Sequence, residues 1–241
     1  MSVPRNRVPG PLATIVILAA ACSDEHVPAA RLGERLFNDP GLSTSGFNAV
    51  SCAICHVVDP ASPAVVPGRF DPGFNLANTA GRPSWWGGYE LTLLDALNVC
   101  LDRFMSGRLL SQQDEEARLL YAYLDANSPE PASSPLPFTV VRNVTGLADV
   151  AGDSDRGRDL YERACHRCHG AAHTGAGALD TRPPIVPKST VAEFRPEQVR
   201  AVVEEKIRHG RFFNLAGVMP LYSVEVMTDA DVADILAYLG L

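Results

Sequence analysis

The sequence feature that constrains this chain most is a five-residue pattern, Cys-x-x-Cys-His, which occurs at residues 52–56 and again at 165–169. Each copy is preceded by Gly-x-x-Leu with an aromatic residue after it, and each is followed by Ala-Tyr-Leu. These flanking segments lie at residues 33–37, 157–161, 122–124 and 237–239. Ordered matches at nearly constant spacing indicate a duplicated unit. The chain is therefore expected to build one small structural unit twice.

A Cys-x-x-Cys-His pattern predicts attachment of a c-type haem. Two thiols three positions apart share one face of a helix and can add to the haem vinyl groups as thioethers, and the adjoining histidine then reaches the iron. The residues expected to hold two covalently attached haem c groups are Cys52, Cys55, Cys165 and Cys168, with His56 and His169 as iron ligands. A zinc site is disfavoured because the two cysteine pairs are far apart, and a thioredoxin-like motif because the chain shows no βαβ pattern.

The first 21 residues have the pattern of an export signal. Arg5 and Arg7 precede a short apolar run that ends in small residues directly before Cys22, and this run is too short to span a bilayer. The arrangement is similar to the bacterial lipoprotein box, a resemblance that implies lipidation of Cys22 and a membrane anchor. A plain signal that is cleaved nearby is the alternative. Both interpretations predict an exported, periplasmic protein.

Prolines concentrated between Asn127 and Pro137 cannot lie in a helix interior and predict a domain boundary. We expect a first haem domain over residues 22–126, a linker over 127–150 and a second haem domain over 151–241. Apolar residues in both domains recur at helical spacing, and long strand-like alternation is lacking. The expected fold class is therefore all-α.

Local signals place several helices. Pro196 suits a helix start and Gly210 lies just past a helix end, which predicts a helix between them. Thr228 is expected to cap the final helix and Ser111 to cap an earlier one. A third strong helical pattern covers residues 91–105.

Composition limits the classes of function. The chain has 241 residues, of which 46% are hydrophobic, and a formal net charge of −7. This much apolar content excludes a disordered chain. An acidic chain lacks the basic face that a nucleic-acid binder needs, so redox proteins are the expected partners, and the acidic surface could steer a basic one.

Residues 157–241 resemble a class I cytochrome c through the Cys165-x-x-Cys168-His169-Gly170 segment, the Met-Pro pair at 219–220 and the final helix. In that family the histidine and the methionine of the Met-Pro loop are the axial ligands, which implies these roles for His169 and Met219. Met227 is the competing ligand. Such ligation raises the haem potential and closes both axial positions, as in an electron carrier.

The first half resembles two other families. Residues 32–56 are similar to the opening of the dihaem cytochrome c peroxidases, and residues 97–107 resemble a helix of the thiosulfate dehydrogenases and sulfur-oxidising cytochromes. In the thiosulfate dehydrogenases the cysteine of that helix is the second axial ligand, which implies this role for Cys100. Met105 is the rival ligand. Five residues of α-helix turn by about 140°, so both side chains are not expected to face one iron.

These patterns predict a membrane-anchored dihaem cytochrome, with two cytochrome c-like domains, that carries single electrons at the outer face of the cytoplasmic membrane. The alternatives are an oxidoreductase similar to thiosulfate dehydrogenase, with a small inorganic substrate, and an enzyme similar to cytochrome c peroxidase. The remaining histidines are expected to point outward, and two adjacent tryptophans to wall a haem. These residues are His166, His173, His209, Trp85 and Trp86.

Overall fold

The computed structural model describes residues 27–130, 135–136, 138–139, 141, 143–144, 150–212 and 217–241. The expected export signal and Cys22 lie outside the described residues, as do parts of the expected linker. In the described part the regular structure is helical, with one isolated bridge between Trp85 and Glu90, which confirms the all-α class. No helix in this part is both long enough and apolar enough to cross a membrane.

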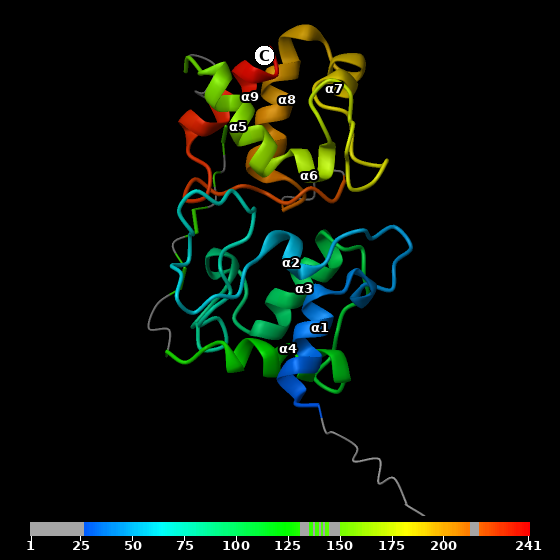
Figure 1. Cartoon of the computed structure of the whole chain (residues 1–241), viewed down its shortest axis with the longest axis vertical. Coiled ribbons are helices and arrows are strands. Elements are labelled where there is room, and N and C mark those ends of the chain that lie inside the picture. The colour runs from blue at the N-terminus through cyan, green and yellow to red at the C-terminus, as the bar shows by residue number, and fades with distance from the viewer. Residues whose placement is uncertain are drawn as a thin grey trace, which may run out of the picture.

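The first half forms one group of helices in Figure 1, coloured blue to green. Its elements are α1 (Ala29–Asn38), η1 (Pro40–Leu42), α2 (Cys52–Cys55), η2 (Trp86–Gly88), α3 (Leu93–Arg103) and α4 (Glu115–Ala126). Helix α1 packs on α4. The buried core between these helices contains Phe37, Leu101, Met105, Leu110 and Leu120.

The second half forms the other group, coloured green to red in Figure 1. Its elements are α5 (Ser154–Ala164), α6 (His166–His169), α7 (Lys188–Glu193), α8 (Pro196–His209) and α9 (Asp229–Tyr238). Helix α5 packs on α9 as α1 packs on α4. The most buried side chains of this core include Tyr161, Met227, Val232, Ile235 and Leu236.

The duplicated glycines explain why both halves form the same helix pair. A Cβ atom on Gly33 would lie 2.0 Å from the carbonyl oxygen of Leu119 in α4. A Cβ atom on Gly157 would lie 1.9 Å from the carbonyl oxygen of Asp234 in α9. Each glycine therefore lets two helix backbones meet at a distance that any side chain would prevent.

Most of the local helix signals are confirmed. Helix α8 has the predicted bounds, and Thr228 caps α9 in a capping box with Asp231. The prediction for Ser111 is wrong, because Asp114 is the N-cap of α4. The Asp114 carboxylate accepts a hydrogen bond from the Ser111 backbone N–H at 2.6 Å, so the chain turns before the helix begins.

The two helix groups meet along the sides that carry the Cys-x-x-Cys-His segments. Figure 1 shows α2 and α6 on the facing sides of the two groups. The Phe74 side chain, from the loop after α2, is buried in the core of the second half. Arg103, at the end of α3, donates from Nη1 to the Phe212 carbonyl oxygen at 3.1 Å. The domain bounds that the sequence suggests stay a prediction.

Alanine at either duplicated glycine is expected to force its helix pair apart. We predict that Gly33→Ala and Gly157→Ala each lower the free energy of unfolding by about 2 kcal/mol or more, because overpacked helix contacts cost this much. Denaturant titration followed by circular dichroism measures the loss. Gly46→Ala is the matched control, since a Cβ atom there meets nothing within 4 Å. Equal stability of all three variants would contradict the close helix contact.

Candidate functional site

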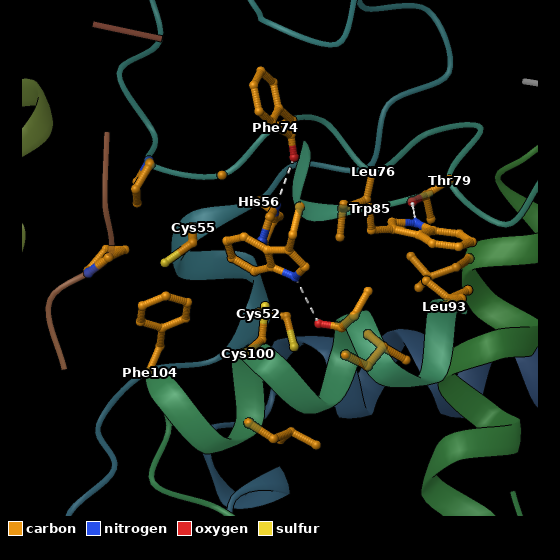
Figure 2. Close-up of a pocket in the computed structure, with 18 of the residues that line it drawn as sticks. Cys52, Cys55, His56, Phe74, Leu76, Thr79, Trp85, Leu93, Cys100 and Phe104 are labelled. Carbon is orange, nitrogen blue, oxygen red and sulfur yellow. Dashed lines mark hydrogen bonds between the residues drawn. The ribbon is translucent and has the colours of Figure 1, made fainter. Parts of the chain in front are cut away.

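A large apolar cavity lies in the first half, beside the first Cys-x-x-Cys-His segment. It holds about 1300 Å³ of space between atoms, part of which is open to solvent. Figure 2 shows Cys52, Cys55 and His56 reaching into it from α2 and the residue that follows, and Cys100 reaching into it from α3. Trp85 and Trp86 also line the cavity. One chamber thus collects the predicted residues of the first site.

His56 is oriented by a backbone carbonyl. Its Nδ1 atom lies 2.7 Å from the Phe74 carbonyl oxygen, as the dashed line in Figure 2 shows, so Nδ1 carries the proton and donates it. Burial lowers the pKa of His56 below its ordinary value, which favours the neutral ring. A neutral imidazole with a proton on Nδ1 has its lone pair on Nε2, the atom that binds a metal.

Gly73 leaves room for this ring. A Cβ atom on Gly73 would lie 2.2 Å from Cε1 of His56 and 2.7 Å from Nε2. Any side chain at position 73 would therefore displace the imidazole. The backbone N–H of Gly73 donates to the Cys55 carbonyl oxygen at 3.1 Å, which ties this loop to the end of α2.

His169 has the same arrangement in the second half. Its Nδ1 atom lies 2.9 Å from the Pro184 carbonyl oxygen, and burial lowers its pKa. The neighbouring Gly170 has φ +68°, and its carbonyl oxygen accepts from the Tyr161 hydroxyl at 3.0 Å. Two histidines that follow Cys-x-x-Cys segments are thus both held by carbonyls, with Nε2 left for a ligand.

The cysteines of both segments are thiols placed for covalent attachment. All five cysteines among the described residues are free, so no disulfide competes for them. Burial raises the pKa of Cys52 to about 11, and the pKa values of Cys55 and Cys165 to about 12. Neutral thiols at one edge of an apolar chamber, with an imidazole beside them, fit a covalently attached haem c.

Cys100 and Met105 both line the first cavity. The two side chains were expected to point in different directions because both would lie on one helix. This argument does not apply, because α3 ends at Arg103 and Met105 lies beyond it. Met105 is also part of the buried core and only 3% exposed. Burial raises the pKa of Cys100 far above its ordinary value, and nearby Cys52 adds to the shift. A bound metal cation is what would keep this thiol deprotonated.

The second site has two candidate methionines in different surroundings. Met219 is half-buried, and its carbonyl oxygen accepts from the Arg211 backbone N–H at 2.9 Å. Tyr222, three residues later, donates from its hydroxyl to the carbonyl oxygen of Ala164, the residue before Cys165. This loop therefore reaches the second Cys-x-x-Cys-His segment. Met227 has no exposed surface and packs among aliphatic core side chains.

The second half also closes the first cavity. Pro220 and Leu221, which directly follow Met219, are among the lining residues. The Trp86 ring stacks on the Phe212 ring of the second half, with centroids 5.6 Å apart. A charge on Cys168 would raise the pKa of Cys55, so the two segments are close enough to interact electrostatically. The two candidate haem sites thus share a boundary.

Three histidines were expected to point outward, and the structure corrects one of them. His173 is exposed and His166 is half-buried. His209 is buried, with 6% of its surface exposed. Its Nδ1 atom lies 2.5 Å from a Glu205 carboxylate oxygen, and its Nε2 atom lies 2.5 Å from the Val141 carbonyl oxygen. Helical spacing alone did not show that the linker covers this side of α8.

Sequence patterns missed three residues that shape the first site. Phe74 supplies a carbonyl, Gly73 supplies space and Arg82 supplies a buried positive charge on the cavity wall. All three lie in the loop between α2 and α3, where no period or motif marks them. The tripeptide Gly81-Arg82-Pro83 is typical of a turn, but it does not mark these residues as part of a site.

Comparison with known proteins finds relatives for parts of this chain. Residues 152–239 match the family described as "Cytochrome C oxidase, cbb3-type, subunit III". Thiosulfate dehydrogenase of Psychrobacter arcticus is 25% identical over 162 residues, which are 64% of this chain and 45% of that protein. The solved structure of thiosulfate dehydrogenase TsdBA from Marichromatium purpuratum is 18% identical in sequence, with a TM-score of 0.42. The match covers 90% of this chain and 48% of the TsdBA chain. This chain therefore spans about half the length of these relatives. Residues 152–239 of this chain thus form a cytochrome c domain of the cbb3 type, and the chain is homologous to thiosulfate dehydrogenase.

Proposed function

We propose that this protein is a dihaem electron carrier that accepts single electrons from one redox protein and passes them to another. The observation that carries the proposal is the repeated histidine geometry. His56 and His169 each follow a Cys-x-x-Cys segment, and each donates from Nδ1 to a loop carbonyl so that Nε2 is left for iron. A haem held in this way supplies reversible one-electron chemistry.

The chain's own geometry supports the residues proposed for the two sites. Cys52 and Cys55 would attach the first haem and Cys165 and Cys168 the second. His56 and Cys100 are proposed as ligands of the first iron, and His169 and Met219 as ligands of the second. Met219 is favoured over Met227 because its loop reaches the second segment, whereas Met227 is enclosed by core side chains.

The contact between the halves supports electron exchange within the chain. Pro220 and Leu221 join the wall of the first cavity to the residue proposed as a ligand in the second site. The stacked Trp86 and Phe212 rings close the same boundary. Cofactors held on the two sides of this boundary could exchange electrons within the chain, without a diffusing carrier.

Location is part of the proposal. Arg5, Arg7 and the apolar run before Cys22 support export and lipidation, which would hold the protein at the outer face of the cytoplasmic membrane. An acidic protein anchored there would attract basic redox partners. Mass spectrometry of the mature N-terminus measures whether Cys22 carries lipid.

A second candidate function is the oxidation of thiosulfate, favoured by the homologous thiosulfate dehydrogenase and by Cys100 on the cavity wall. In that reaction a sulfur–sulfur bond forms between two thiosulfate anions and two electrons leave. Among the described residues that line the cavity, Arg82 is the only lysine or arginine. One cation in an apolar chamber is little to bind two dianions, so the carrier is the stronger candidate. The likeness to the peroxidases stays a prediction, which no feature of the site supports.

Replacing the cysteines of one segment should remove one haem and leave the other. We predict that Cys52→Ala/Cys55→Ala and Cys165→Ala/Cys168→Ala each reduce covalent haem from two groups per chain to one. Intact mass and the pyridine haemochrome spectrum measure this number. Cys100→Ala is the matched control and is expected to keep both haems. A wild-type chain with one haem or none would overturn the dihaem proposal.

The ligand at the first iron should determine how far apart the two reduction potentials lie. A thiolate stabilises Fe(III) and a thioether Fe(II), so wild type is expected to titrate in two well-separated one-electron steps. We predict that Cys100→Met raises the lower potential by about 59 mV or more, a tenfold change in the one-electron equilibrium. Potentiometric titration followed by visible absorbance measures both steps. Overlapping steps in wild type that separate on Met105→Ala would instead assign Met105.

Thiosulfate turnover separates the two candidate functions. We expect the purified holoprotein, with an artificial electron acceptor in excess, to consume no thiosulfate, because the described part of the cavity wall offers one lysine or arginine to bind an anion. Electrons from a reduced redox protein should pass through the same preparation at once. Steady consumption of thiosulfate by wild type that is absent in Cys100→Ala would contradict the electron-carrier function and support the thiosulfate-oxidising one.

A further inference from the structure

We propose that Tyr222 is a positioning residue of the second site: its hydroxyl ties the loop that carries Met219 to the second Cys-x-x-Cys-His segment and so keeps the methionine sulfur on the iron. The bond joins the Tyr222 hydroxyl to the carbonyl oxygen of Ala164 at 2.7 Å. The inference rests on the proposed function, which assigns Met219 as a ligand of the second haem.

The donor and the acceptor of this bond suit each other. Ala164 is the last residue of α5 and directly precedes Cys165. Carbonyl groups in the last turn of a helix have no partner within the helix, so they need a donor from elsewhere. Tyr222 is 4% exposed, and burial holds its pKa well above the ordinary value. The hydroxyl therefore stays protonated and donates.

The main chain of Tyr222 is anchored on α8. Its backbone N–H donates to the Ile207 carbonyl oxygen at 2.8 Å, and its own carbonyl oxygen accepts from Arg208 Nη1 at 3.2 Å. Arg208 is buried and is itself held by an ion pair with the carboxylate of Asp229. The backbone of Tyr222 is thus fixed on one helix, while its hydroxyl reaches the end of another.

Met219, three residues earlier, is held to the same helix by its backbone. Its carbonyl oxygen accepts from the Arg211 backbone N–H at 2.9 Å. A Cβ atom on Gly210 would lie 2.4 Å from that oxygen, so the loop passes close to the end of α8. The hydroxyl of Tyr222 extends this support to the segment that carries the histidine. A movement of the loop away from that segment would break the bond.

The first half shows that such a segment folds without a tyrosine hydroxyl. Phe37 occupies the position that Tyr161 has in the repeat, and the Val57 carbonyl oxygen accepts from the Leu76 backbone N–H at 2.8 Å. In the second half the Tyr161 hydroxyl donates to the Gly170 carbonyl oxygen instead. Tyrosine hydroxyls at both ends of the segment therefore belong to the second site and not to the repeated framework.

The test is a titration of the purified ferric dihaem protein with imidazole. At the second iron the bond to the Met219 sulfur breaks as a bond to an imidazole nitrogen forms, and no electron is exchanged. The far-red absorbance of a thioether-bound ferric haem follows this displacement. We expect Tyr222→Phe, which keeps the ring and loses one hydrogen bond, to bind imidazole about fivefold more tightly at the second haem.

Tyr161→Phe is the matched control. It removes the hydroxyl at the other end of the same segment, and that hydroxyl comes from α5 and not from the loop that carries Met219. Both phenylalanine variants should lower the free energy of unfolding, as measured by denaturant titration. Tyr161→Phe should nevertheless keep the wild-type affinity for imidazole.

Two results would overturn the inference. One is an imidazole affinity of Tyr222→Phe equal to that of wild type, and the other is an equal gain in Tyr161→Phe, which assigns both hydroxyls to general stability. Met219→Ala separates the inference from the proposed function. Tight imidazole binding by Met219→Ala alone keeps the ligand and removes the role of Tyr222. Wild-type behaviour of Met219→Ala, or absence of the second haem from wild type, refutes the proposed second site itself.

Discussion

The hydrogen bond from a histidine Nδ1 to a loop carbonyl is the interaction on which both candidate sites depend. It sets the tautomer and fixes the ring at once, so that Nε2 is left as the atom that would hold iron. A Cys-x-x-Cys-His segment without this contact would leave its imidazole free to rotate. The long loops that follow α2 and α6 bring the carbonyl oxygens of Phe74 and Pro184 within hydrogen-bonding distance of His56 and His169.

The two halves resemble each other more closely in their packed helix pairs than in the residues around their histidines. A Cβ atom on Gly33 or on Gly157 would lie at nearly the same distance from a carbonyl oxygen of the opposing helix, so the two helix pairs have the same close packing. The loops between the framework helices differ. The first half has an apolar chamber with Cys100 and Arg82 in its wall, whereas the second presents a methionine on a Met-Pro loop. The helix pair is repeated while the residues around the two histidines differ, so the two proposed haems would lie in unequal surroundings.

How much of the structure the sequence predicts depends on the distance along the chain between the residues that make each contact. The ends of α8 and the cap at Thr228 are set by neighbours in sequence, and both were predicted correctly. The prediction that Ser111 caps a helix was wrong, because the carboxylate of Asp114, three residues later, accepts a hydrogen bond from the Ser111 backbone N–H. The burial of His209, the carbonyl of Phe74 and the position of Arg82 depend on segments that are distant in sequence. Local spacing carries no information about such contacts, and these contacts complete the sites.

Phe74 serves both halves of the molecule. Its carbonyl holds the imidazole of the first site, while its side chain lies in the core of the second half against Tyr222 and Val226. The repeated units are therefore not interchangeable modules. A first half separated from its partner would lose the anchor of the loop that directs His56, and its imidazole would no longer be held in one direction.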